Sequence, residues 1–341
     1  MNNGDFKIFN NVLMKYLGKG GVVVIPDDIQ EISHFAFHSE ECAKITEIVI
    51  PASVKEVNTP FSHCSALERI TVDAENQHYQ TIDGNLYTKD GTTLVAYAPA
   101  AKKDRFTIPK GVTTIEAFAF SICSLEELVI PSTVKSIENA ALSGNIKRLL
   151  VDAENTTYYM HGGLLLTKDN KTLLRYVGDE STMEVPLGIT NIATGAFART
   201  ALASVTLPET VQAIGNGAFS DCLNLETVTL PQSLTSIEQY AFYGCKKLAG
   251  IALPDSLKSI GRNTFEGCSS LTEIEIPQGV TELDGKMFGG CTALKSVIIP
   301  QSVANISTFA FDGCTNVTIK GQASSYAQAF AKEQRMTFLE I

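Results

Sequence analysis

The cysteines are the side chains best suited to chemistry in this chain of 341 residues, and Cys245 has the most suggestive neighbours. Gly244 precedes it and Lys246 and Lys247 follow it, and positive charge beside a thiol lowers its pKa and makes it a nucleophile. However, five of the cysteines follow one another at a constant spacing of 23 residues. Since a regular lattice gives each thiol the same surroundings, we predict a buried structural ladder rather than a nucleophile. The ladder comprises Cys42, Cys64, Cys123, Cys222, Cys245, Cys268, Cys291 and Cys314.

Histidine offers a second chemistry, the binding of zinc. His34, His38 and His63 lie close in sequence to Cys42 and Cys64, and zinc prefers imidazole and thiolate ligands. Only His34 and His38 have the close spacing of a ligand pair, and they fall in a segment that we expect to be a turn. We therefore predict surface histidines and no metal site.

Other catalytic and cofactor-binding patterns are missing from the sequence. The GKGG segment at residues 18–21 lacks the G-x-x-x-x-G-K-[ST] spacing of a phosphate loop and precedes an expected strand. The chain contains no G-x-S-x-G motif, and no set of serine, histidine and aspartate or pair of carboxylates indicates a catalytic site. We predict a protein that is not an enzyme and that uses no cofactor.

Charge and hydropathy exclude two classes of partner. The 27 basic and 37 acidic residues give a net charge of −10, whereas binding to nucleic acid calls for a basic face. No run of about 18 apolar residues occurs, so we predict no membrane insertion. The first 20 residues lack the basic and then apolar regions of a secretory signal, which leaves a cytoplasmic location open.

An internal repeat supplies the elements that must position these residues. Its unit reads I-P-x-x-[VL]-x-x-I-x-x-x-A-F-x-x-C-x-x-L-x-x-[IV]-x-[IL]-P. Short alternating runs, such as VTL before Pro231, predict half-buried strands that end at proline because proline cannot donate a hydrogen bond to a sheet. One such unit cannot bury its apolar side alone, but stacked units share a continuous core. The 23-residue step is kept by Pro208, Pro231, Pro254, Pro277 and Pro300 and by Phe219, Phe242, Phe265, Phe288 and Phe311.

This repeat resembles the BspA-like (treponemal) leucine-rich-repeat family, whose hallmark is the AFxxCxxL…IP phrase. The resemblance extends from about Val22 to Ile319. It implies a mostly β, α/β-type solenoid, a right-handed superhelix in which parallel strands line a concave face. The resemblance also implies a protein of the cell surface or a secreted protein, since relatives are mostly surface or secreted proteins of host-associated bacteria and some protists, implicated in adhesion.

The repeat is interrupted twice and changes at both ends. Residues 74–108 and 153–185 are each entered through the phrase VDAEN, at residues 72–76 and 151–155, and contain apolar runs around Lys-Asp-Gly or Lys-Asp-Asn, which predicts β-hairpin inserts. Residues 1–25 resemble a shortened insert and are predicted to form an N-terminal cap. Residues 320–341 predict a closing helix and strand, with Ser324 or Ser325 as the N-cap. We expect one leucine-rich-repeat domain over residues 1–341.

Two groups of residues are candidates for binding a protein. Six of the ten tyrosines lie in the inserts, and tyrosine is enriched at protein interfaces, although these rings could instead pack the hairpins onto the solenoid. These are Tyr79, Tyr87, Tyr97, Tyr158, Tyr159 and Tyr176. The outward strand positions Val49, Val129 and Leu150 are more apolar than contact with solvent requires, so either a hairpin insert folded inward or a partner protein would cover them. A neighbouring row, Glu47, Arg69, Arg105, Glu127 and Arg148, alternates in charge and predicts ion pairs between adjacent repeats.

The sequence therefore predicts a non-enzymatic scaffold that binds a protein, through its concave face and hairpin rims. The partner would be a component of a host cell or of a neighbouring cell surface. The alternative is a structural spacer, a stiff arm that displays other domains of a longer surface protein. A binder would retain a partner when immobilised, whereas a spacer would not.

Overall fold

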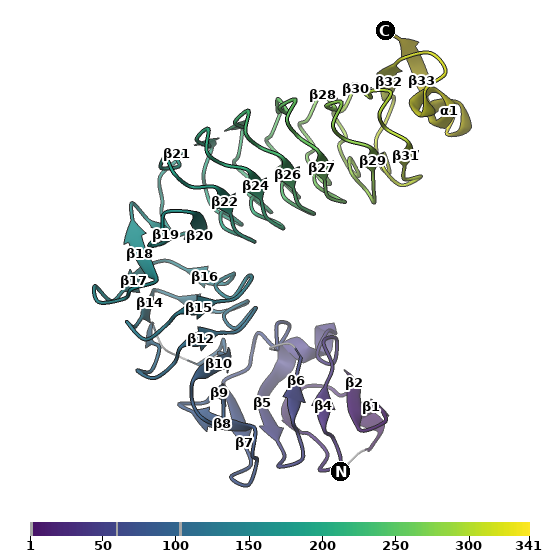
Figure 1. Cartoon of the computed structure of the whole chain (residues 1–341). Coiled ribbons are helices and arrows are strands. Elements are labelled where there is room, and N and C mark those ends of the chain that lie inside the picture. Colours follow the sequence, from purple (N-terminus) through teal and green to yellow (C-terminus); the bar gives the residue numbers. More distant parts are fainter. Residues whose placement is uncertain (1–2, 59–60, 102–103) are drawn as a thin grey trace. The chain divides into compact units, whose positions relative to one another are not determined.

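The computed structural model describes residues 3–58, 61–101 and 104–341, and the chain divides into two compact units. Unit 1 comprises Met1–Met160 and unit 2 comprises His161–Ile341. In both units the backbone runs in successive coils, most of which contribute a strand that ends near a proline and a second, two-residue strand. The predicted fold class is confirmed: the chain is a mostly β solenoid of stacked parallel strands with one short C-terminal α-helix (Figure 1).

The longer strands of unit 1 form two parallel sheets of three strands each. Their inward side chains, such as Ile48 and Leu128, are fully buried, whereas alternate side chains face outward. We call the outward side chains of these six strands the strand face of unit 1. The sheets consist of β3 (Gly21–Val24), β5 (Ile45–Ile50) and β7 (Arg69–Val72), and of β11 (Arg105–Thr107), β14 (Glu127–Ile130) and β17 (Leu149–Val151).

The remaining elements of unit 1 form the other side of its coils and the predicted hairpins. The terminal hairpin and the first insert contain antiparallel pairs, β1 with β2 and β9 with both β8 and β10. These elements are η1 (Asn3–Asp5), β1 (Phe6–Phe9), β2 (Val12–Tyr16), β4 (Glu31–Ile32), η2 (Glu40–Lys44), β6 (Glu56–Val57), β8 (Tyr79–Ile82), β9 (Asn85–Thr88), β10 (Thr93–Ala96), β12 (Thr114–Ile115), β13 (Ser124–Leu125), β15 (Ser136–Ile137) and β16 (Asn145–Ile146). One further strand, β18 (Tyr158–His161), spans the boundary between the units.

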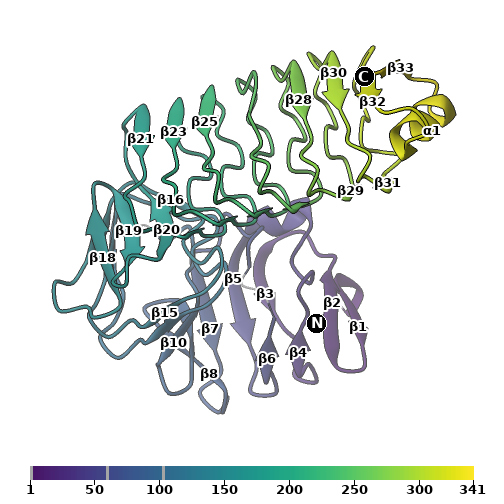
Figure 2. The ribbon, with the colours of Figure 1, turned by 45° about the horizontal axis from the view of Figure 1, so that its top comes forward.

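Unit 2 begins with an antiparallel hairpin and continues as a regular stack. The hairpin consists of β19 (Leu164–Thr167) and β20 (Thr172–Tyr176), and the two-residue strands are β22 (Asn191–Ile192), β24 (Ala213–Ile214), β26 (Ser236–Ile237), β27 (Ser259–Ile260), β29 (Glu282–Leu283) and β31 (Asn305–Ile306). The longer strands form two groups in Figure 2, separated by a coil whose residues 251–253 form no strand. They are β21 (Thr182–Glu184), β23 (Ser204–Thr206) and β25 (Thr227–Thr229), and then β28 (Glu273–Glu275), β30 (Ser296–Ile298) and β32 (Thr318–Gly321).

The hairpin turns and the C-terminal cap have the residues that their geometry requires. Lys89-Asp90-Gly91 connects β9 to β10 and Lys168-Asp169-Asn170 connects β19 to β20, as predicted. Helix α1 (Tyr326–Glu333) has Ser325 as its N-cap, whose side chain accepts a hydrogen bond from the backbone N–H of Gln328. After the helix, β33 (Thr337–Glu340) pairs with β32 and extends that sheet.

Two columns of side chains fill the core of unit 2. The Phe197, Phe219, Phe242, Phe265 and Phe288 rings are fully buried and stacked, with centroids 5.0–5.9 Å apart and planes within 3–7° of parallel. Beside them, each cysteine thiol donates to the backbone carbonyl of a phenylalanine in an earlier coil, as Cys268 does to Phe242 at 3.2 Å. The thiol thus satisfies a carbonyl inside an otherwise apolar core.

Candidate functional site

The thiol of Cys245 is part of the core of unit 2. It donates a hydrogen bond to the Phe219 carbonyl at 3.1 Å and is fully buried, whereas Lys246 and Lys247 are exposed. The Lys247 ammonium lies 3.5 Å from a Glu226 carboxylate oxygen instead. Burial therefore dominates and raises the pKa of Cys245 well above its ordinary value. A protonated and inaccessible thiol cannot act as a nucleophile.

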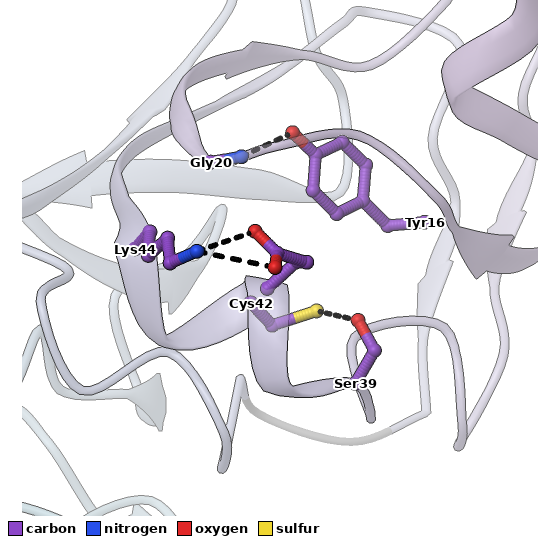
Figure 3. A network of polar contacts seen from close by, with 6 residues as sticks. Tyr16, Gly20, Ser39, Cys42 and Lys44 are labelled. Atoms are coloured by element: carbon purple, nitrogen blue, oxygen red, sulfur yellow. Dashed lines mark hydrogen bonds and ion pairs between the residues drawn. The ribbon is translucent and has the colours of Figure 1, made fainter.

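Cys42 in unit 1 has a different environment, which sequence reasoning missed. Its sulfur lies 3.2 Å from the Ser39 hydroxyl (Figure 3), and the Cys64 thiol hydrogen-bonds to it as well. These two hydrogen bonds outweigh burial and lower the pKa of Cys42 to about 6, while the pKa of Cys64 is raised. The ammonium group of Lys44, two residues after Cys42, lies 2.9 Å from a Glu41 carboxylate oxygen and forms an ion pair with it. Both sulfurs are fully buried. The feature of the sequence that could have indicated this environment was Ser39, three residues before the cysteine.

The histidines of unit 1 form ring contacts. The His38 and His63 rings lie 3.7 Å apart between centroids, and Phe35 packs edge-on against His34 and His38. Burial and the neighbouring His38 lower the pKa of His63. In residues 3–58, 61–101 and 104–341, no three histidine, cysteine, aspartate or glutamate side chains come together in a way that could hold a metal ion.

The structure places most of the candidate tyrosines inside the solenoid instead of on hairpin rims. Tyr87, Tyr97, Tyr158 and Tyr176 are buried, and Tyr79 and Tyr159 are half-buried. Tyr97 stacks on Phe120 with centroids 5.2 Å apart, and Tyr176 lies 5.9 Å from Phe197. The reason is that β10 and β20, the last strands of the two hairpins, pair in parallel with β12 and β22. The last strand of each hairpin therefore occupies the place of a two-residue strand in a regular coil. Tyr97 and Tyr176 occupy the place of the phenylalanine that recurs in the repeat.

Two further tyrosines attach the inserts to the preceding coil. The Tyr79 hydroxyl accepts a hydrogen bond from the backbone N–H of Val57 at 3.1 Å, and the Tyr158 hydroxyl accepts one from that of Ile137 at 3.0 Å. Burial raises the pKa of both phenols. Of the two roles left open for the tyrosines, packing of the hairpins thus accounts for the contacts of Tyr79, Tyr97, Tyr158 and Tyr176.

Asn76 and Asn155 hold the start of each insert, and sequence reasoning missed their role. The Asn155 amide donates to the carbonyls of Pro131 and Val134, and its oxygen accepts from the backbone N–H groups of Thr157 and Tyr158. Asn76 makes the same four contacts one insert earlier. Both side chains are buried with their hydrogen bonds satisfied. The repeated phrase VDAEN was the signal that could have identified them.

The charged row on the strand face of unit 1 forms the predicted ion pairs. Arg69 Nη2 lies 2.6 Å from Glu47 Oε2, and the Thr71 hydroxyl donates to Glu47 Oε1 at 2.7 Å. These contacts, with Arg69 first, lower the pKa of Glu47. The next three coils pair differently: Arg105 Nε lies 3.0 Å from Glu127 Oε1, and Arg148 contacts the other oxygen, Glu127 Oε2. The ladder prediction is confirmed, and it contains an Arg–Glu–Arg triad.

The apolar row lies two residues further along the same strands. Val24 and Leu150 are 41% and 39% exposed, and Val49 and Val129 are half-buried. In unit 2 the equivalent outward positions are mostly polar or small, for example Thr206, Thr229, Ala252 and Glu275. The strand face of unit 1 therefore combines guanidinium donors with aliphatic surface, which is chemistry for recognition.

Comparison with known proteins gives one family and several similar folds. The family model described as BspA type leucine rich repeat region matches residues 19–92, 95–160 and 190–318 in six copies. The crystal structure of the pneumococcal vaccine antigen PcpA is similar in fold, with a TM-score of 0.56 and 20% identity over 94% of this chain and 79% of that one. No curated protein matches the chain.

Two further solved structures show weaker likeness. A leucine rich cell surface protein from Faecalibacterium prausnitzii has a TM-score of 0.48 and 21% identity over 96% of each chain. A leucine-rich repeat protein from Eubacterium ventriosum has the same TM-score and 18% identity, over 91% of this chain and 80% of that one. Among the residues that the structure describes, no helix has both the length and the apolarity needed to cross a bilayer.

Proposed function

Because the chain belongs to the BspA type leucine-rich-repeat family, as its repeat predicts, we propose that it is a non-enzymatic scaffold that binds another protein through the strand face of unit 1. Repeat solenoids commonly use such an extended row of equivalent strands as a binding surface. In keeping with the family, the proposal places the protein at a cell surface, where its partner is a component of a host cell or of a neighbouring cell.

The apolar row is the observation that carries this proposal. Val24, Val49, Val129 and Leu150 are aliphatic at positions where the coils of unit 2 mostly carry polar or small residues. Aliphatic side chains on an exposed sheet gain free energy when a partner removes them from water, by about 25 cal/mol for each Å² buried. The tyrosines are buried or half-buried and pack the hairpins, so the proposal does not depend on them.

The proposal is tested by capture on the immobilised full chain. Proteins released from host epithelial surfaces are passed over wild type and over a V129N/L150N variant, which replaces aliphatic by neutral polar side chains of the strand face. We expect the variant to lose a partner that wild type retains. The matched control is T229N, the equivalent outward position in unit 2, which should retain it.

The same experiment gives a different result if the chain is only a structural spacer that displays other domains. If wild type retains no specific protein, or if V129N/L150N and T229N retain the same protein equally well, the strand face of unit 1 is not the binding surface. Unchanged thermal unfolding of the variants must accompany the comparison, since these outward positions do not fill the core.

A further inference from the structure

We propose that Arg105 and Arg148, held on either side of Glu127, form a carboxylate-binding subsite, and that the partner presents an acidic residue beside an aliphatic one. This inference depends on the proposed function, because it names the chemistry of the partner segment that the strand face of unit 1 would bind.

The backbone brings the three side chains together from three successive coils. Strands β11 and β14 pair in parallel with Arg105 opposite Glu127, and Leu128 donates its backbone N–H to the Arg148 carbonyl at 2.9 Å. Adjacent strands are about 4.8 Å apart, so the two arginines are two strand spacings apart, with the glutamate between them.

The exposure of the three side chains distinguishes this triad from an ordinary surface ion pair. The Glu127 side chain is 5% exposed, whereas those of Arg105 and Arg148 are 63% and 69% exposed. Each guanidinium has five N–H donors, and the glutamate provides one oxygen to each arginine. The carboxylate accepts a hydrogen bond from Arg148 and holds Arg105 by an ion pair that lacks hydrogen-bond geometry. Both guanidinium groups therefore stay beside Glu127, and their exposed faces remain available to a ligand.

The balance of charge determines which ligand fits. Two arginines share one carboxylate, so the triad keeps a net positive charge, whereas the Glu47–Arg69 pair is neutral. This positive group belongs to a chain whose net charge is −10. A long polyanion such as nucleic acid is repelled by that overall charge, but a short segment with one or two carboxylates is not.

The surroundings of the triad add an aliphatic requirement. Side chains alternate along a strand, so Thr107, Val129 and Leu150 lie on the same face as the triad, two residues further along. Unit 2 offers the opposite chemistry, with Glu273 and Glu275 on β28. A partner segment with a carboxylate next to an aliphatic side chain therefore complements unit 1 and not unit 2.

Selection from random linear peptides displayed on phage, against the immobilised full chain, tests the inference. We expect enrichment of Asp or Glu next to Leu, Ile or Val. A selected peptide should bind an R105Q/E127Q/R148Q variant roughly tenfold or more weakly, since it loses charge-assisted hydrogen bonds. This triple variant leaves no unpaired buried carboxylate, so its fold should persist, which circular dichroism and thermal unfolding check.

Two controls separate this subsite from general charge effects. K147Q removes an exposed ammonium that pairs with Glu126 at 2.7 Å and should leave peptide affinity unchanged. R105K/R148K keeps both charges but loses the forked donors, and it should also bind several-fold more weakly. Raising the salt concentration should weaken binding to wild type more than binding to the triple variant.

The outcomes distinguish this subsite from the proposed function. If peptides bind the triple variant as tightly as wild type but fail to bind V129N/L150N, the carboxylate subsite is wrong and the protein-binding face stands. Selection of peptides without acidic residues, or tighter binding of heparin or DNA than of acidic peptides, also overturns the subsite. If no peptide or protein binds this face at all, both proposals fail.

Discussion

Unit 1 and unit 2 contain the same repeat but use it differently. In unit 2 the coils follow one another with stacked phenylalanines and a thiol that satisfies a carbonyl in each step, and the outward positions are mostly small or polar. In unit 1 the first insert interrupts the stack, Tyr97 replaces a phenylalanine, and the strand face carries arginines and aliphatic side chains. The comparison shows that core positions are constrained by stacking, whereas outward positions are free to differ.

The inserts that interrupt the stack need their own contacts to hold them on the solenoid. A regular coil is attached by its neighbours through equivalent residues, but an insert begins with backbone groups that no equivalent coil can satisfy. Asn76 and Asn155 supply those partners from a side chain. The hairpins therefore remain part of the solenoid through this polar contact together with the pairing of β10 and β20 with the next coil. Unit 2 beyond its hairpin is stabilised mainly by apolar stacking.

The largest expected effect comes from breaking the phenylalanine column of unit 2. Phe242 stacks between Phe219 and Phe265 and is fully buried. Phe242→Ala leaves a cavity that neighbouring coils cannot close, and it should lower the free energy of unfolding by about 4 kcal/mol, measured by chemical denaturation. The adjacent Tyr243→Ala, at a more exposed position, is the control. Equal losses in the two variants would contradict a continuous column.

A somewhat smaller effect is expected where unit 1 depends on polar attachment. Asn155→Ala leaves two carbonyls and two N–H groups without their side-chain partner. The free energy of unfolding should fall by about 3 kcal/mol, with faster amide exchange in the strand that follows. Thr156→Ala changes an exposed neighbour and should have little effect. Normal amide exchange in Asn155→Ala would show that the hairpin does not need this contact.

The left-handed turn at Gly267 in unit 2 can be tested by a substitution that adds one methyl group. Gly267 has a φ of 78°, and an added Cβ would lie 3.4 Å from the Gly244 Cα of the preceding coil. Gly267→Ala should cost about 1 kcal/mol, because side chains disfavour the left-handed region. Gly250→Ala, which has open space around the new methyl group, should not be destabilised. A stable Gly267→Ala variant would mean that the turn can change its conformation.

The thiols of the two units should differ in titration. We expect thiolate absorbance from one cysteine with a pKa of about 6, absent in Cys42→Ser, because Cys64 and Ser39 hydrogen-bond to its sulfur. Burial raises the pKa of Cys268 to about 12. A lowered pKa in the folded state stabilises folding above the ordinary thiol pKa of about 8.5, and this contribution is lost as the pH falls through 6. Titration of all thiols above pH 8 would contradict the contrast.

Much of the fold could be predicted from the spacing of residues. A period of 23 residues means that Phe242 and Phe265 must occupy equivalent positions, and alternation in runs such as VTL separates inward from outward side chains. The ion pairs of the charged row followed from the same logic, since equivalent residues of adjacent coils lie about 4.8 Å apart. Repetition converts distance along the chain into distance in space, so the sequence alone determined the solenoid and its core.

Only the tertiary structure decided what happens where the period breaks. Tyr97 and Tyr176 are buried because β10 and β20 align with the strands of the next coil, and no spacing rule extends across an insert. The same holds for Cys42, whose ionisation depends on a hydrogen bond from Ser39 as well as from Cys64. The strand alignment depends on how each insert folds, and the Ser39 contact involves a residue outside the repeat positions, so a repeat pattern encodes neither.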